Sequence, residues 1–168
     1  MKTITITITL KKSEIDYDVA MTTHVVMNRE LAAGATQEQG FNYANTQDET
    51  GEVNLITRYA EKAISELAGL MTAYLEDYAY ESTNDLNSFD AALFHLDMPD
   101  NFDMTLTAPL RAAMHDYVVN RTIYDWFMRA KPDEAAIYER LYDEAYSRVK
   151  SLLNRRTGIS RIKPWPAI

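Results

Sequence analysis

The chain has 168 residues and a mass of 19.2 kDa, a length that favours one compact domain. Hydrophobic residues make up 46% of it and charged residues 25%, so the composition excludes a wholly disordered or collagen-like chain. Cysteine is absent, which excludes disulfides, a thiolate nucleophile and cysteine-bound metals. The net charge is −8, and no apolar run approaches the roughly 18–20 residues that cross a bilayer, so we expect no membrane partner.

Residues 3–10 alternate threonine with isoleucine or leucine, which predicts a half-buried strand with one apolar face. This alternation differs from the continuous apolar core of a secretory signal, so we do not expect export. Ser13 has the features of a helix N-cap, because acidic residues follow it in the first turn. Residues 15–25 also fit the two-residue period of a strand, but the expected N-cap at Ser13 favours a helix over 13–28. Its expected buried stripe is Ile15, Val19, Thr22 and Val26.

Residues 33–51 are polar, carry glycines and show no period, which predicts a long flexible loop. Apolar residues then recur every three or four positions from Glu52 to Leu75, as in an amphipathic helix. Residues 76–82 fit either a continuation of this helix or a short strand. Residues 89–98 predict a second strand, with Ala92, Phe94, Leu96 and Met98 on one face.

Two amphipathic helices are predicted at 106–129 and 132–156, and the two-residue connection between them favours an antiparallel hairpin. The expected fold class is therefore α+β and predominantly helical: a bundle of three or four helices with a small antiparallel sheet, built from 3–10 and 89–98. Residues 1–157 would form this single domain. Residues 158–168 begin with a glycine and contain two prolines, so they would leave the domain as an extended C-terminal arm.

The sequence contains no phosphate-binding loop, dinucleotide fingerprint, zinc-peptidase motif or nucleophile elbow. His24, His95 and His115 fall in three different predicted elements, without the spacing of metal ligands. The acidic run 97–103 lacks the glycine and the terminal glutamate of a calcium loop, so capping and turn roles fit it better. We therefore expect no enzymatic activity, no cofactor and no bound metal.

Two further groups of side chains, acidic residues and tyrosines of the helices, are expected to have structural roles. The acidic residues of the helices lack the Glu-x-x-His motifs of di-iron bundles and are expected on solvated faces. These are Glu61, Glu66, Glu76, Asp77, Asp133, Glu134, Glu139, Asp143 and Glu144. The tyrosines of the last two helices are expected to pack the hairpin together, with an exposed ridge for subunit contact as the alternative. These are Tyr117, Tyr124, Tyr138, Tyr142 and Tyr146.

Charge is distributed unevenly along the chain. All 25 acidic residues lie at or before Glu144, whereas the last 24 residues hold six basic ones. Basic residues at a helix C-terminus favour its dipole, which accounts for those in the last helix but not for those beyond it. We therefore predict a partner-binding arm, and the acidic body, which would repel a duplex, argues against sequence-specific nucleic-acid binding. The predicted partner-binding residues are Arg155, Arg156, Arg161, Ile162, Lys163 and Trp165.

Three segments carry a resemblance to a known family: Met98-Pro-Asp-Asn-Phe102, Leu110-Arg-Ala-Ala-Met-His-Asp-Tyr-Val-Val-Asn-Arg-Thr-Ile-Tyr-Asp-Trp-Phe127, and the helix from Glu134 to Arg156. Together they resemble the small head–tail connector (head-completion) proteins of tailed phages, in which a helix led by proline precedes a last helix and a basic end. The N-terminal strand and the 33–51 segment depart from that pattern.

The resemblance implies a non-enzymatic virion subunit that assembles as a ring at the portal, with a C-terminal arm that engages its neighbours. Portal or tail proteins would be its other partners, and it would be found in the host cytoplasm and in the assembled virion. The expected function is therefore that of a phage or prophage structural protein at the head–tail junction. The alternative is a host or mobile-element binding module whose basic tail recruits an acidic protein.

Overall fold

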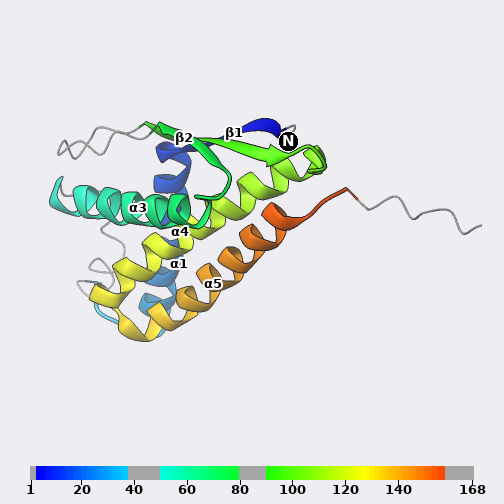
Figure 1. The fold of residues 1–168 in the computed structure, drawn as a ribbon. Helices are drawn as coiled ribbons and strands as arrows, with labels where there is room; N and C mark the ends of the chain where they lie inside the picture. The colour runs from blue at the N-terminus through cyan, green and yellow to red at the C-terminus, as the bar shows by residue number, and fades with distance from the viewer. Residues whose placement is uncertain (1–2, 38–49, 80–89, 158–168) are drawn as a thin grey trace, which may run out of the picture.

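A computed structural model describes residues 3–37, 50–79 and 90–157 of the chain (Figure 1). This part of the chain has the predicted α+β class, and most of its residues are helical. Figure 1 shows the sheet lying over the helices, with α4 crossing beneath it. In chain order, the elements are β1 (Thr3–Lys11), α1 (Lys12–Ala32), α3 (Thr50–Leu70), β2 (Leu75–Ala79), β3 (Ala91–Pro99), the 3-10 turn η1 (Met104–Leu106), α4 (Thr107–Ala130) and α5 (Pro132–Asn154).

The sheet is antiparallel and has the strand order β1-β3-β2. β1 and β3 pair along their whole length, with Ile6 opposite Leu96. On the outer face, the Thr5 hydroxyl donates a hydrogen bond of 2.8 Å to Asp97, and Thr7 Oγ1 lies 3.1 Å from His95 Nδ1. The apolar faces predicted for both strands are confirmed, because the inward side chains are buried: Ile6, Ile8, Leu10, Ala92, Phe94, Leu96 and Met98.

The helix predicted to reach Leu75 ends earlier, because residues that follow it pair with β3 as a strand of the sheet. α3 ends at Leu70 and residues 75–79 form β2, so the alternative left open at 76–82 is a strand over 76–79, and 80–82 lie outside the described residues. The Asp97 N–H donates to the Tyr74 carbonyl oxygen at 2.7 Å, so this edge of β3 is paired by a strand. α3 also begins at Thr50, within the predicted loop 33–51, most of which lies outside the described residues.

α1 confirms the predicted helix and corrects its cap and its buried stripe. Ser13 lies within the first turn, and the N-cap position belongs to Lys11, which makes no side-chain capping hydrogen bond. The chain passes directly from β1 into α1. Thr23 is buried where Thr22 was expected, and its hydroxyl is satisfied by donating to the carbonyl oxygens of Val19 and Ala20 at 3.0 and 2.9 Å.

The last two helices form the predicted antiparallel hairpin, in which α4 and α5 run side by side (Figure 1). Aromatic side chains fill the space between them. The ring of Tyr117 meets that of Tyr142 edge-on at 6.2 Å between centroids, and Phe127 stacks on Tyr138 at 5.4 Å. The interpretation of these tyrosines as packing residues is therefore confirmed.

Phe127→Ala is expected to lower the free energy of unfolding by about 3–5 kcal/mol, because the ring is fully buried and stacked on Tyr138. Met128→Ala is the matched control, since this neighbouring side chain is 49% exposed and its truncation should cost about 0.5 kcal/mol or less. Urea denaturation followed by circular dichroism measures both. Equal losses for the two variants would contradict the packing described.

One helical carboxylate, Glu134, is buried against the expectation of a solvated face, whereas Glu66 is exposed as predicted and forms an ion pair with a neighbouring helix. Glu134, at the start of α5, is buried, accepts a hydrogen bond from Arg29 of α1 and lies 3.7 Å from Lys131 Nζ. The hydrogen bond from Arg29 holds the pKa of Glu134 below its usual value, aided by the positive charges of Arg29 and Lys131. Glu66 of α3 accepts from Arg121 Nε of α4 at 3.0 Å. As predicted, the following are exposed: Glu76, Asp133, Glu139, Asp143 and Glu144.

Glu134→Gln is expected to flatten the loss of stability in acid. Because the pKa of Glu134 is lowered in the folded state, the ionised carboxylate contributes stability above the unfolded pKa near 4.5, and this contribution is lost as the pH falls through the folded pKa. Urea denaturation at several pH values below 5 should therefore give a shallower decline for Glu134→Gln than for the unmodified protein. Glu139→Gln, exposed on the same helix, should retain the original slope. Identical slopes for all three proteins would show that the partners of Glu134 do not stabilise its ionised carboxylate in the folded state.

Candidate functional site

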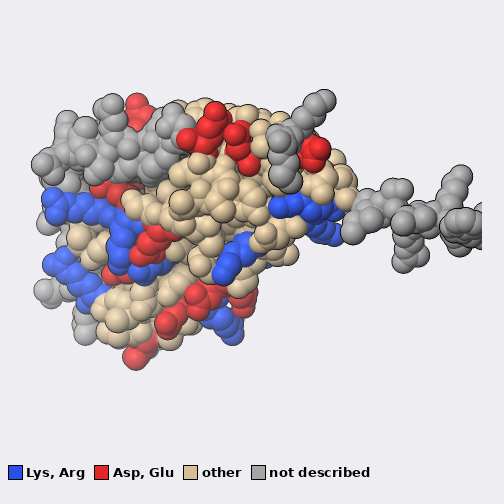
Figure 2. All heavy atoms as spheres, in the orientation of Figure 1, with Lys and Arg blue, Asp and Glu red and all other residues tan. Residues whose placement is uncertain are grey.

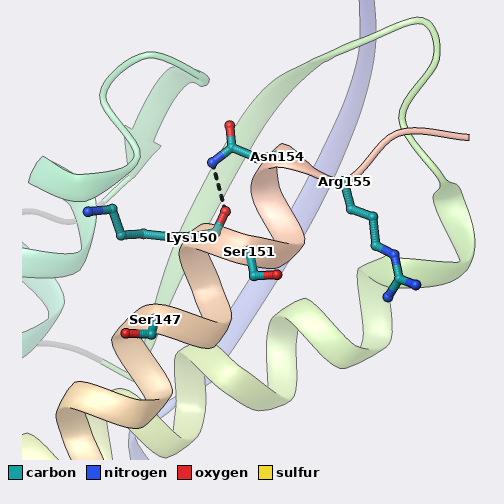
Figure 3. A pocket seen from close by; sticks show the side chains of 5 residues that line it. All are labelled: Ser147, Lys150, Ser151, Asn154 and Arg155. Carbon is teal, nitrogen blue, oxygen red and sulfur yellow. Dashed lines mark hydrogen bonds between the residues drawn. The ribbon is translucent and has the colours of Figure 1, made fainter.

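The described part of the predicted partner-binding segment comprises the end of α5 and the residues up to 157. Side chains three and four positions apart on the last turns of α5 fall on one face of the helix, where they line a shallow, open hollow (Figure 3). We call this surface the α5 patch. Its residues are Ser147, Lys150, Ser151, Asn154 and Arg155.

The α5 patch is basic. Lys150 and Arg155 are exposed, and neither forms an ion pair with a carboxylate in the part of the chain that the structure describes. Lys150 Nζ lies 5.0 Å from the centroid of the Tyr146 ring, and its backbone carbonyl accepts from Asn154 Nδ2 at 2.8 Å. Figure 3 shows the Lys150 and Arg155 side chains extending in different directions from the helix. This arrangement suits several anionic groups spread over a surface better than one small anion.

Arg156 turns toward its own chain. Its Nη1 donates to the Leu153 carbonyl oxygen at 2.7 Å, and its Nη2 donates to the Tyr74 hydroxyl at 3.3 Å. The guanidinium carbon also lies 6.0 Å from the centroid of the Tyr74 ring. The Tyr74 hydroxyl donates in turn to Asn154 Oδ1 at 3.0 Å. Arg156 therefore fastens the end of α5 to the turn before β2, and Arg155 is the exposed member of the pair.

Residues 156 and 157 are also fixed to the turn that follows β3. Arg156 forms an isolated β-bridge with Phe102, and both the backbone N–H and the hydroxyl of Thr157 donate to the Asn101 carbonyl oxygen at 2.9 Å. The chain therefore leaves the domain from a defined point. The other predicted partner-binding residues, Arg161, Ile162, Lys163 and Trp165, lie outside the described residues.

The acidic run at the same turn has the capping role expected of it. The Asp103 carboxylate accepts from the backbone N–H of Thr105 at 3.0 Å and from its hydroxyl at 2.6 Å, which caps η1. These hydrogen bonds hold the pKa of Asp103 below its usual value. Asp97 instead accepts from Thr5 across the sheet.

A second hollow lies between α1 and α4. Glu14, Tyr17 and Asp18 line one side of it, and His115 lines the other. His115 Nε2 lies 2.7 Å from Asp18 Oδ2, a contact that joins the two helices. His24 is exposed on α1. Within residues 3–37, 50–79 and 90–157, no three His, Asp or Glu side chains are placed to hold a metal ion.

An exposed apolar ridge on α1 escaped the sequence analysis. Tyr17, Met21 and Val25 stand four residues apart on the outer face of the helix, with exposed fractions of 63%, 49% and 63%. They come between the buried residues of the same helix, which explains why this stretch also fits the period of a strand. Apolar residues on both faces of one helix were the signal for such a ridge.

Searches of protein-family models, of curated proteins and of solved structures found no match to this chain. None of the described helices is long and apolar enough to span a bilayer. The function therefore has to be inferred from the residues and the geometry of the chain itself.

Tyr74→Phe is expected to loosen the end of α5, because it removes the hydroxyl that links Arg156 to Asn154 and keeps the ring. The free energy of unfolding should fall by about 0.5–1.5 kcal/mol, and the Thr157 amide should exchange its hydrogen faster. Tyr59→Phe, a partly buried tyrosine of α3, is the control and should leave the exchange of Thr157 unchanged. Unchanged exchange in Tyr74→Phe would rule out the anchoring role.

Proposed function

We propose that this protein is a non-enzymatic structural subunit of a phage or prophage virion, at the head–tail junction, that assembles into a ring through its basic C-terminal end. The observation that carries the proposal is the separation of charge along α5. Asp133, Glu139 and Asp143 are exposed in the first half of the helix, whereas the exposed cations of the α5 patch lie at its end. Figure 2 shows basic atoms over this end.

Opposite charges at the two ends of one helix suit a head-to-tail contact between copies. The basic end of one subunit would meet the acidic start of α5 in the next, and such a contact closes into a ring when the rotation between successive copies adds up to a full turn. A flat array of carboxylates also matches the divergent directions of Lys150 and Arg155 better than a single phosphate does.

The residues that follow α5 would extend the same contact. Arg156 is held by Tyr74, so we assign it an anchoring role, with Arg155 as the contacting residue. Arg161, Ile162, Lys163 and Trp165 follow within a few positions and combine cations with large apolar side chains. Tryptophan and arginine are enriched at the energetic centres of protein interfaces. Portal or tail proteins are the other surfaces that this segment would engage.

The alternative function, a host or mobile-element module whose basic tail recruits an acidic protein, depends on the same end of α5. It differs in one physical requirement, because a recruiting module binds a different protein and needs no contact between its own copies. Self-association that depends on the α5 patch therefore separates the two functions.

The double variant Lys150→Glu/Arg155→Glu is expected to weaken self-association at least about tenfold, because it reverses the exposed cations of the α5 patch. Sedimentation velocity of the full chain over a range of concentrations at low salt measures the association. High salt should also weaken the self-association of the unmodified protein, since salt screens contacts between exposed charges. Arg140→Glu is the control: it reverses an exposed cation in the acidic half of α5 and should not weaken association.

An unmodified protein that stays monomeric at all concentrations in low salt would overturn assembly through this end and leave the recruiting module as the better function. Association that is equally strong in the double variant would show that the α5 patch is not the contact.

A further inference from the structure

We propose that the free edge of β1 pairs with β1 of a second copy of this chain, so that two three-stranded sheets join into one. This interface is separate from the end of α5 and goes beyond the proposed function.

β1 is an edge strand without the usual protection. The order β1-β3-β2 leaves one side of β1 unpaired by any described residue. Edge strands are commonly protected by short length, bulges, prolines or charged residues. β2, the other edge, has five residues and an irregular register between Leu75 and Asp77. β1 has nine residues in regular register, and no proline or charge lies between Thr3 and Leu10.

The ladder determines which backbone groups of β1 face the free edge. The Asp97 N–H points to the β2 side, where it donates to the Tyr74 carbonyl. In an antiparallel sheet, successive residues direct their backbone groups to opposite sides, so the even-numbered residues of β3 pair with β1. The Lys12 N–H, which donates to Asp90, agrees with this parity. By the register, the backbone groups left facing the free edge are those of Thr3, Thr5, Thr7 and Thr9.

The sequence of β1 is suited to pairing with itself. In an antiparallel pair centred on Ile6, Thr5 lies opposite Thr7 of the second copy, so the unpaired backbone groups of the two edges meet. The isoleucines of both copies then fall on the same, helix-facing side, because the repeat has a period of two. No charged side chains are opposed within this pair, although each chain carries a net charge of −8. The contact is two-fold symmetric and closes at a dimer.

The outer face of β1 is exposed over most of its length. Thr3, Thr5 and Thr7 are exposed. At the other end of β1, Thr9 and Leu10 line a hollow together with residues of α1 and α4. Within the described part of the chain, no residue forms a backbone hydrogen bond with this edge of β1.

The parity of the ladder provides a selective test. Thr7→Pro removes an N–H that points to the free edge and has no partner in β3, so the β1–β3 ladder stays intact. Thr7→Ala loses the same side chain, with its contact to His95, and keeps the N–H. Sedimentation velocity in high salt, which screens contacts at the α5 patch, should show a dimer for the unmodified protein and for Thr7→Ala. The dissociation constant of Thr7→Pro should rise at least about tenfold.

Cross-linking provides a second measurement that does not depend on the stability of the proline variant. The chain has no cysteine, so single cysteines report one pairing. Residues opposite each other in a hydrogen-bonded antiparallel pair have Cα atoms about 5.5 Å apart, within the range that a disulfide bridges. A mixture of Thr5→Cys and Thr7→Cys should therefore form disulfide-linked dimers on mild oxidation faster than Thr105→Cys, which lies on η1 outside the sheet.

When Lys150→Glu/Arg155→Glu is added to the Thr5→Cys and Thr7→Cys proteins, they should cross-link as fast as without it. The experiment therefore distinguishes failure of the contact at the α5 patch from failure of the contact at β1. A monomeric protein in high salt, equal dimerisation of Thr7→Pro and Thr7→Ala, or cross-linking no faster than that of Thr105→Cys would each overturn the pairing of β1.

Discussion

Helix α4 is enclosed by the rest of the domain, and the other elements take their places by covering it. A helix with apolar residues around most of its circumference must be packed on several sides. The sheet covers one side, α1 and α3 cover others, and α5 folds back along the remaining face. Truncating any one of these contacts exposes part of the same central helix. The buried residues of α4 are Leu110, Ala113, Met114, Tyr117, Val118, Val119, Thr122, Ile123, Trp126 and Phe127.

The elements that could be predicted from the sequence are those whose signals are local. Strict alternation identified β1 and β3, and a proline after a two-residue link identified the hairpin of α4 and α5. The end of α3 and the existence of β2 depend instead on β3, which lies about twenty residues further along the chain. No periodicity within 71–82 contains that information. The cap of α1 was misplaced for a related reason, because the Lys12 N–H donates to the carbonyl oxygen of Asp90, the residue before β3.

At the candidate site, too, local sequence signals could be interpreted, whereas contacts between residues remote in the chain could not be predicted. The concentration of basic residues after Glu144 directed attention to the end of α5, where the structure shows Lys150 and Arg155 exposed. Composition could not separate Arg155 from Arg156, because the difference arises from Tyr74, more than eighty residues away in the chain. The partners of Glu134 and Glu66 are similarly remote in sequence. Ion pairs and hydrogen bonds across the fold thus decide which charged side chains remain available for a partner.

The attachment of Thr157 to Asn101 limits where the C-terminus can act. A polypeptide covers at most about 3.3–3.6 Å per residue, and Trp165 follows Thr157 by eight residues. The Cα atom of Trp165 therefore stays within roughly 29 Å of this attachment, whatever path the intervening residues take. Insertions or deletions between these two positions would lengthen or shorten this maximum distance, and the folded surface would remain the same. The length of this short tether, as much as its composition, thus defines which neighbouring surfaces are within range.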